Sequence, residues 1–457
     1  MSAQKKSRNY TIDMCEGSIL KKLLLFALPL VASGVLQLFF NAADVIVVGR
    51  FAGDHALAAV GSNGSMINLL TNVFMGLSVG ANVLVARFFA AKHEKELRKT
   101  VHTAMTVSVV CGIFLAIFGA LAAKQVLVLM QSPAEVIELS TLYLRIYFMG
   151  MPAIMAYNFG AAILRGVGDT KRPLYYLTFS GVVNVGLNLI FVIVFHMSVA
   201  GVALATIVSQ YISAFLVVKC LMNEESGIRL EKQYLGIDKE ILDKILQIGL
   251  PAGIQGSLFS LSNVVIQSSV NSFGATIVAG NSASQNIEGF VYIAMNAFSQ
   301  AVVAFVSQNL GAGKFERINK IVITAQACVL AVGVVIGNGA YLLGEPLLHL
   351  YTDSEVVVAA GLRRLVFIAV PYALLGMMES MVGALRGLGY SVMPMIVSLL
   401  GVCAFRIVWI FVLFRMEQFH TIETVYCAYP VSWILTLSVH IICFIVVRCN
   451  MKKKWGV

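Results

Sequence analysis

The sequence predicts an all-α membrane protein of about twelve transmembrane helices, built as two pseudo-symmetric six-helix lobes with a central cavity. Of its 457 residues, 59% are hydrophobic and 12% are charged, whereas soluble domains carry about 25% charge. The apolar residues fall in stretches of about twenty or more, long enough to cross a hydrocarbon core of about 30 Å. These stretches lack the alternation of a barrel strand, and a helix satisfies its own backbone hydrogen bonds in lipid. The fold is therefore expected to be helical throughout.

The apolar stretches indicate an equal number of spans in each half of the chain. In the first half we expect spans at residues 22–48, 57–86, 100–122, 139–162, 174–195 and 199–221. In the second half we expect spans at residues 245–272, 278–308, 320–342, 361–384, 392–414 and 425–448.

Basic residues gather in the even-numbered connections between spans and at the chain ends. The odd-numbered connections are poor in Lys and Arg, apart from Arg363 and Arg364. Cytosolic loops carry an excess of positive charge, so most of the 33 basic residues lie on the side of both termini. The N-terminal residues do not resemble a cleavable secretory signal. We therefore expect a multi-pass protein of the bacterial cytoplasmic membrane with both termini cytosolic.

The most polar internal stretch runs from Met222 to Lys244. It separates two halves of equal span number, which predicts an N-terminal lobe at 1–222, a cytosolic linker at 223–244 and a C-terminal lobe at 245–457. Because each half holds an even number of spans, both enter the membrane from the same face, and the pseudo-twofold axis runs along the membrane normal. A cavity is expected between the two bundles.

Two pairs of segments repeat between the halves. The segment "FALPLVASGVLQLFFNAAD" from Phe26 runs parallel to "IGLPAGIQGSLFSLSNVVI" from Ile248. The segment "LRGVGDTKRP" from Leu164 matches "LRGLGYSVMP" from Leu385 at identical offsets. The glycines of the second pair indicate a tight helix end.

Pro29 and Pro251 interrupt spans one and seven at equivalent places in the repeat. A proline frees a backbone carbonyl and allows a bend. These residues are candidate hinges during switching, and a fixed kink is the alternative.

Polar side chains inside the first half form the first functional candidates. Gln37, Asn41 and Asp44 are spaced four and three apart, which places them on one face of span one. Span five adds Asn184 and Asn188, again four apart. A charged side chain in hydrocarbon costs at least about 2.5 kcal/mol, so one that persists usually lines a cavity or pairs. The alternatives are an interfacial position for Asp44 and helix packing for the asparagines.

The second half carries polar stripes on spans seven and eight and two acids within the membrane. Buried acids at such depths indicate a cavity, and a single stripe could also hold helices together. Arg406 and Arg145 could pair with these acids or snorkel, and we treat both as structural. The candidate cavity residues are Glu288, Glu379, Gln255, Asn263, Gln267, Tyr292 and Asn296.

The sequence excludes several function classes. The net charge of +10 reflects loop topology rather than a basic face for nucleic acid. The eight cysteines lack paired spacing, so we expect no metal site and no disulfide. No GxxxxGK[ST], HExxH or GxSxG motif is present. We therefore expect no enzyme and no cofactor, and transport that draws on an ion gradient.

These residues resemble the multidrug and toxic compound extrusion (MATE) family, prokaryotic type. The resemblance covers the chain from Leu20 to about Val447 and is carried by "NAADVIVVGRFAGDHALAAVG", "ILRGVGDTKRP" and "ALRGLGYSVMP". It implies an antiporter that exports organic cations, drugs or toxic metabolites in exchange for protons or sodium. It also implies that Asp44 and Asn184 belong to a cation site of the first lobe. The chain departs from the family at Asn188, where relatives often carry a second aspartate.

The second lobe departs from the NorM-type pattern as well. Phe259 stands where those members have a glutamate on span seven, with Gln255 nearby, and Glu379 is the nearest acid to their aspartate on span ten. Asp44 is the only carboxylate in the first-half spans, so we expect it to couple transport, together with Asn41, Gln37, Asn184 and Asn188. A single titratable carboxylate favours a proton over sodium as the coupling ion.

Two other functions compete with export. A lipid-linked saccharide flippase of the same superfamily often has additional spans and several cationic cavity residues, which we expect this chain to lack. A channel or a receptor explains a twofold repeat with buried acids less well. The expected partners are small amphipathic or cationic molecules and the lipid bilayer, without nucleic acid, and we expect a monomer.

Overall fold

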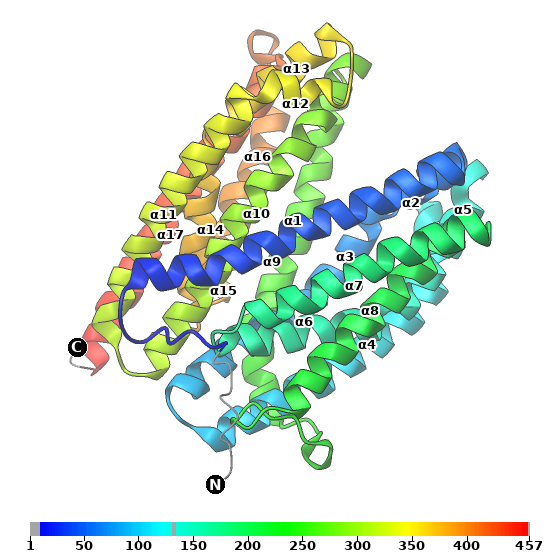
Figure 1. Cartoon of the computed structure of the whole chain (residues 1–457). Coiled ribbons are helices and arrows are strands. Elements are labelled where there is room, and N and C mark those ends of the chain that lie inside the picture. Colours follow the sequence, from blue (N-terminus) through cyan, green and yellow to red (C-terminus); the bar gives the residue numbers. More distant parts are fainter. Residues whose placement is uncertain (1–9, 130–133, 456–457) are drawn as a thin grey trace. The chain divides into compact units, whose positions relative to one another are not determined.

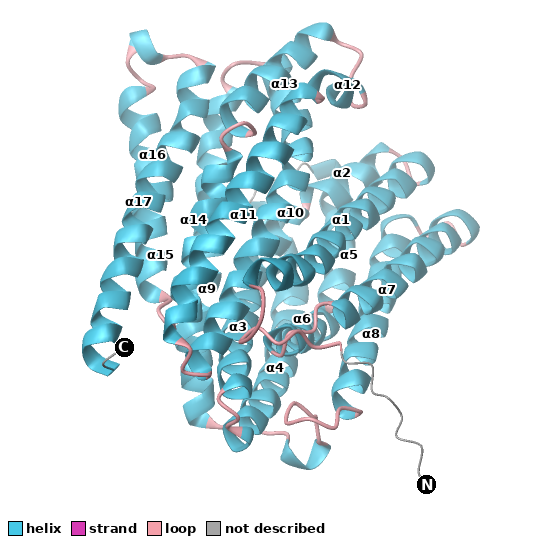
Figure 2. Ribbon diagram, turned by 60° about the vertical axis from the view of Figure 1, so that its left-hand side comes forward, coloured by secondary structure: helices cyan, strands magenta, loops and turns pink. Residues whose placement is uncertain are grey.

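A computed structural model describes residues 10–129 and 134–455, and every regular element in this part of the chain is helical (Figure 1, Figure 2). The first half holds α1 (Ile19–Phe51), α2 (Asp54–Ser62), α3 (Gly64–Ala90), α4 (Glu94–Leu129), α5 (Ala134–Met149), α6 (Met151–Gly166), α7 (Lys171–Leu189) and α8 (Ser198–Met222). The second holds α9 (Lys239–Asn271), α10 (Ala275–Gly311), α11 (Phe315–Leu342), α12 (Gly344–His349), α13 (Glu355–Ile368), α14 (Tyr372–Gly387), α15 (Val392–Ser398), α16 (Phe405–Val408) and α17 (Ile422–Trp455).

Short π-helical and 3-10 segments complete the elements. The π-helical segments continue α7 and flank α16, so that the predicted fifth and eleventh spans are each one helical rod. The π-helical segments are Ile190–Val194, Leu399–Ala404 and Trp409–Leu413, and the 3-10 turns are Lys232–Tyr234 and Glu417–Phe419.

Nine helices of the described chain are long and apolar enough to cross a membrane, and two bent pairs bring the number to eleven. The bent pairs are α5 with α6, at 48°, and α13 with α14, at 45°. Helix α9, the predicted seventh span, is 33 residues long but is not apolar enough to join them, because it carries the polar stripe. The predicted second span is divided into α2 and α3 next to Asn63. These segments account for the predicted all-α membrane fold.

The chain divides into two compact units. The first contains the described residues up to Val60 together with Leu84–Asp238, and the second contains Gly61–Val83 and Lys239–Val457. The second unit therefore includes most of α3, which the predicted lobe boundaries assigned to the first lobe. In the first unit α1 lies along α7, and α4 packs on α5 and α6 (Figure 1). In the second, α10 packs against α11, α13 and α14.

Glycines of α3 and α9 explain why residues 61–83 belong to the second unit. A Cβ on Gly76 would lie 2.3 Å from the Gly253 nitrogen, and one on Gly253 would lie 2.4 Å from the Val73 carbonyl oxygen. Gly80 and Gly249 make similar approaches one turn away. Small residues four apart let two membrane helices approach at backbone distance. This contact fixes α3 against α9.

The sequence repeat is also a repeat of packing. Each bend between paired helices faces a glycine of the preceding long helix. A Cβ on Gly112 of α4 would lie 2.4 Å from Pro152 Cα, and a Cβ on Gly333 of α11 would lie 2.7 Å from Ala373 Cα. Both glycines and both partners stand at the same offset as the two "LRG" motifs. The bent helices are held by the same backbone contact in each half.

The two "LRG" turns adopt one backbone conformation. Gly168 has φ +96° and Gly389 has φ +97°, a left-handed region that favours glycine. The amide of Gly168 donates to the Arg165 carbonyl at 3.0 Å, and that of Gly389 donates to the Arg386 carbonyl at 2.8 Å. The predicted tight helix end is confirmed at both copies.

We predict that Gly253→Ala destabilises the protein while Gly339→Ala does not. The new methyl group of Gly253→Ala meets backbone atoms of α3 that cannot move alone, and overpacking costs about 1–3 kcal/mol. Gly339 has nothing within 4 Å of its Cβ position, and alanine is the better helix former by about 1 kcal/mol. Thermal unfolding of the purified protein in detergent measures both. Equal melting temperatures for the two variants would contradict the α3–α9 contact.

Candidate functional site

Asp44 on α1 lies at the centre of a polar cluster in the first unit. Asn188 Nδ2, on α7, donates to Asp44 Oδ1. The amide orientation that satisfies Asn184 also directs its Nδ2 to Asp44 Oδ1, at 2.9 Å, and its Oδ1 accepts from the Thr206 backbone N–H at 3.3 Å. Asn184 and Asn188 are buried, at 5% and 0% exposed. The carboxylate is thus held by two amide donors one helical turn apart.

The local sequence of α7 allows α1 to approach it. A Cβ at Gly181 would lie 1.8 Å from Phe40 Cε2, so only glycine leaves room for this ring of α1. Asn184 follows Gly181 by three residues and Asn188 by seven, which places both asparagines on the same face of α7. The close contact at Gly181 therefore brings the α1 carboxylate to the two amides.

The cluster contains fewer residues than the sequence predicted. Asp44, Asn184 and Asn188 come together, whereas Gln37 and Asn41 are exposed on α1 and join none of these hydrogen bonds. One acceptor of the cluster remains free among the described residues: the buried Asn188 Oδ1 has no hydrogen-bond partner. A buried polar atom left without a partner is expensive, and this one lies beside a carboxylate.

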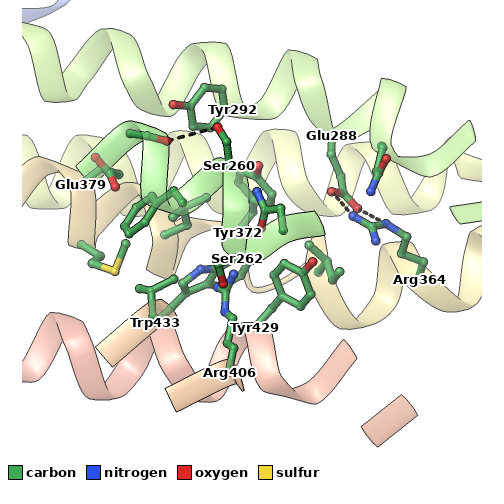
Figure 3. Close-up of a pocket in the computed structure, with 18 of the residues that line it drawn as sticks. Ser260, Ser262, Glu288, Tyr292, Arg364, Tyr372, Glu379, Arg406, Tyr429 and Trp433 are labelled. Carbon is green, nitrogen blue, oxygen red and sulfur yellow. Dashed lines mark hydrogen bonds and ion pairs between the residues drawn. The ribbon is translucent and has the colours of Figure 1, made fainter. Parts of the chain in front are cut away.

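A cavity of about 570 Å³ lies within the second unit. Helices α9, α10, α13, α14 and α17 line it, together with residues of α3 and α16 (Figure 3). Its wall combines charged, amide and hydroxyl groups with five aromatic side chains that include Tyr372, Tyr429 and Trp433. The lining residues are Asn72, Gly256, Phe259, Ser260, Ser262, Asn263, Gln285, Glu288, Tyr292, Arg364, Ile368, Tyr372, Leu375, Met378, Glu379, Val402, Arg406, Tyr429 and Trp433.

The predicted cavity residues divide into two groups. Four of them line the cavity: Glu288, Glu379, Asn263 and Tyr292. The other three lie outside this lining. Their side chains form hydrogen bonds to another helix or to an adjacent turn of their own helix. Gln255 accepts from Arg386 at 2.9 Å, Gln267 donates to Asn271 at 2.9 Å, and Asn296 donates to Tyr292 at 3.4 Å.

Glu288 and Arg364 form a buried ion pair at one end of the cavity (Figure 3). The guanidinium Nε and Nη2 donate to the two carboxylate oxygens at 2.9 and 2.8 Å, and Nη1 donates to Asn281 Oδ1 at 2.5 Å. Arg364 was predicted to lie in a loop between two spans; in the structure it lies inside α13 and is 3% exposed. The acid that was expected to face a substrate is thus neutralised by a neighbouring helix.

Arg406 was expected to be structural, and the structure instead places it in the cavity wall. Its Nε donates to Ser432 Oγ at 2.9 Å. Its guanidinium carbon lies 4.2 Å from the ring centroid of Tyr429 and 5.9 Å from that of Trp433. The expected absence of cationic cavity residues is therefore wrong. The position of Arg406 in an apolar run was the available signal, since lipid does not tolerate an unsupported charge.

Arg145, the other arginine expected to be structural, belongs neither to the Asp44 cluster nor to the cavity lining. It is exposed, and its Nε donates to the Ala120 carbonyl at 3.3 Å. Tyr429 and Trp433 were missed altogether, because aromatic residues are common throughout such a chain and spacing alone does not show which of them face a cavity.

A family model named MatE matches the chain twice, at residues 29–190 and 251–412. The chain belongs to the MatE family. The two matches coincide with the two halves of the repeat, so both halves carry the family's pattern. The protein is accordingly a multi-pass membrane protein of this transporter family.

Curated relatives span nearly the whole of this MatE chain. The probable multidrug resistance protein YoeA of Bacillus subtilis (strain 168) is 28% identical over 427 residues, covering 92% of each chain. The probable multidrug resistance protein NorM of Thermotoga maritima is 24% identical over 417 residues, covering 90% of this chain and 89% of that protein.

Solved structures show the same fold. An outward-facing MATE family transporter of the MOP superfamily matches with a TM-score of 0.91 at 19% identity, covering 98% of this chain and 100% of that one. A MOP superfamily transporter from Pyrococcus furiosus, described by the reverse polarity of its binding pocket, matches with a TM-score of 0.90 at 20% identity and the same coverage.

We predict that Glu288→Gln lowers the stability of the protein by about 3–5 kcal/mol, because it leaves the Arg364 charge buried and unpaired. The double variant Glu288→Gln, Arg364→Gln should recover much of this loss. The adjacent pair of Arg363 with Glu423, at 3.0 Å and more exposed, offers a matched control: Glu423→Gln should cost at most about 1 kcal/mol. Denaturation in detergent measures all three, and equal losses for Glu288→Gln and Glu423→Gln would refute the buried pair.

Proposed function

We propose that this protein is a secondary active antiporter that exports drug-sized small molecules in exchange for protons or sodium ions bound at Asp44. The observation that carries the proposal is the buried cluster of Asp44 with Asn184 and Asn188. An ion-driven carrier needs a group whose charge changes with loading, and an amide cannot titrate. Asp44 is the one carboxylate of the first unit's described membrane spans that is held in such a cluster.

The chemistry of the cluster suits a transported cation. Two amide N–H groups stabilise the ionised carboxylate, and the unpartnered Asn188 Oδ1 adds an uncharged oxygen beside it. A proton would neutralise Asp44 directly. Sodium would be held by carboxylate and amide oxygens, the ligands that hard cations prefer. The lone carboxylate favours the proton, and the free amide oxygen supports sodium.

The cavity of the second unit supports export of small molecules. Ligand pockets usually enclose about 300–1,000 Å³, and this cavity of about 570 Å³ lies inside that range. Aromatic rings supply apolar contact, and a few polar groups give orientation. The named relatives are multidrug resistance proteins, which agrees with a drug-like substrate for this chain.

A lipid-linked saccharide flippase remains the second candidate. The arginines of the cavity favour it, since guanidinium groups bind phosphate well. A flippase would move its lipid substrate and leave a water-soluble dye in place. Everted vesicles that accumulate a dye only under an imposed ion gradient would support the antiporter; vesicles that accumulate no dye under any gradient would support the flippase.

We predict that Asp44→Asn abolishes export that depends on a gradient, reducing the rate at least about tenfold, while folding and substrate binding stay normal. The variant keeps size and hydrogen bonding but cannot titrate. Asn41→Ala, an exposed change on the same helix, should export normally. Dye uptake into everted vesicles measures the rate at several proton and sodium gradients. A wild-type rate for Asp44→Asn would move the coupling site elsewhere, with Glu379 as the next candidate.

We also predict that the 223–244 linker and both termini face the cytosol, because the positive loops demand it. In a chain without its native cysteines, Glu225→Cys in the linker should resist an impermeant thiol reagent in intact cells. Asp353→Cys, in an odd-numbered connection between α12 and α13, should react. Both positions are exposed, so protein burial does not explain a difference. Labelling of Glu225→Cys from outside would reverse the orientation.

A further inference from the structure

We propose that the cavity of the second unit binds aromatic zwitterions, with the anionic group of the ligand at Arg406 and its cationic group at Glu379. The inference rests on the proposed export function and specifies its substrate class. It differs from the expectation of organic cations because the cavity wall contains one unpaired positive charge as well as one unpaired negative charge.

Arg406 is a buried cation whose terminal nitrogens lack a protein partner. It is 4% exposed, and its Nε is already engaged by Ser432. Within the described part of the chain, no carboxylate pairs with it and no acceptor receives a hydrogen bond from Nη1 or Nη2. A buried charge without an opposite charge is strongly unfavourable. An anionic ligand in the cavity would supply what the protein does not.

The ring of Tyr429 holds the guanidinium in a receptive orientation. At 4.2 Å from the ring centroid, one face of the guanidinium is covered, and Ser432 fixes its Nε edge. The donors that remain lie in the guanidinium plane, the geometry that matches a carboxylate with two parallel hydrogen bonds. Trp433, at 5.9 Å, adds a second aromatic surface. A ligand carboxylate attached to a ring would meet both the donors and an apolar wall.

Arg364 provides an internal comparison. Its three donor nitrogens are all occupied, two by Glu288 and one by Asn281. Every nitrogen of this guanidinium is thus already engaged by a protein oxygen, and its charge is cancelled by Glu288. The free positive charge of the cavity comes from Arg406.

Glu379 provides the matching acid. It lines the cavity on α14, and its carboxylate accepts no hydrogen bond from the described residues. Arg386, seven residues and about two turns further along the same helix, attracts Glu379 electrostatically but forms no ion pair with it, and donates instead to Gln255. Glu379 and Arg406 do not pair with each other, and Figure 3 shows their side chains on different parts of the wall.

The two free charges decide which ligand fits. A purely cationic ligand leaves Arg406 unpaired and adds a like charge to the cavity. A purely anionic ligand leaves the Glu379 carboxylate unpaired and adds a second negative charge to the cavity. A zwitterion pairs both groups, and the rings between them bind its aromatic body. Charge complementarity of this kind gives specificity because each wrong ligand leaves a buried charge unmatched.

The test compares three dyes of related ring structure on the purified full-length protein. Rhodamine B carries a carboxylate and a cationic ring system, its ethyl ester carries only the cation, and fluorescein is an anion. Fluorescence anisotropy measures each Kd. We expect the wild-type protein to bind rhodamine B at least about tenfold tighter than the ester, the gain of a charge-assisted hydrogen-bonded pair. Equal or tighter binding of the ester, or no binding of any dye, would overturn the proposal.

Substitutions at Arg406 and Glu379 test whether these residues cause the preference for rhodamine B over its ester. Arg406→Gln should weaken rhodamine B about tenfold or more and leave the ester within about twofold, and Arg406→Lys should lose part of the preference. Glu379→Gln should weaken both rhodamine dyes but not fluorescein. Arg415→Gln is the matched control, since Arg415 also lies over an aromatic ring, at 5.1 Å from Phe411, but is exposed. A preference that survives Arg406→Gln would overturn the proposal; if that variant does not fold, the wild-type comparison and Arg406→Lys still decide.

Transport of the same dyes separates this inference from the proposed function. Everted vesicles that accumulate the ester and rhodamine B equally well, with equal Kd values, would refute the zwitterion site and leave the exporter intact. Vesicles that accumulate neither dye, although the purified protein prefers rhodamine B, would refute export and support the site.

Discussion

The structure depends on one constraint, that a charge within hydrocarbon must be paired, hydrogen-bonded or directed into a cavity. Five charged residues of the two sites meet it in three ways. Asp44 is held by two amides of α7. Glu288 and Arg364 neutralise each other across two helices. Arg406 and Glu379 line the cavity and have no oppositely charged partner among the described residues. A charge whose interactions the protein itself completes has a structural role, whereas a charge that faces the cavity without a partner is available to a ligand.

Glycine contacts create the geometry in which those charges meet. Gly181 brings α1 to α7, and the glycines of α3 and α9 bring those helices to backbone distance. Within a bilayer there is no hydrophobic force between helices, so close packing of small residues supplies much of the association. The same solution appears twice at Gly112 and Gly333, where each half holds a bent helix pair. The scaffold is therefore repeated while the polar chemistry built on it is not.

The two units carry different chemistry on this shared scaffold. The first concentrates an acid with neutral oxygen and nitrogen groups, an arrangement suited to a small cation. The second surrounds a larger cavity with rings and charges of both signs, an arrangement suited to an organic molecule.

The membrane fold, the repeat and the rows of polar residues could be predicted from the order of amino acids alone. Hydrophobic length and helical spacing depend only on the order of residues, so the pairing of Asn184 with Asn188 and the tight turns at Gly168 and Gly389 could be predicted. Tertiary structure decided which polar residues meet. A stripe shows a helix face but not its neighbour, so the sequence could not separate Asp44 from Gln37, or show that Arg364 cancels Glu288. Whether a buried charge is paired depends on the side chains of the helix packed against it. Only the packed bundle specifies which helix that is.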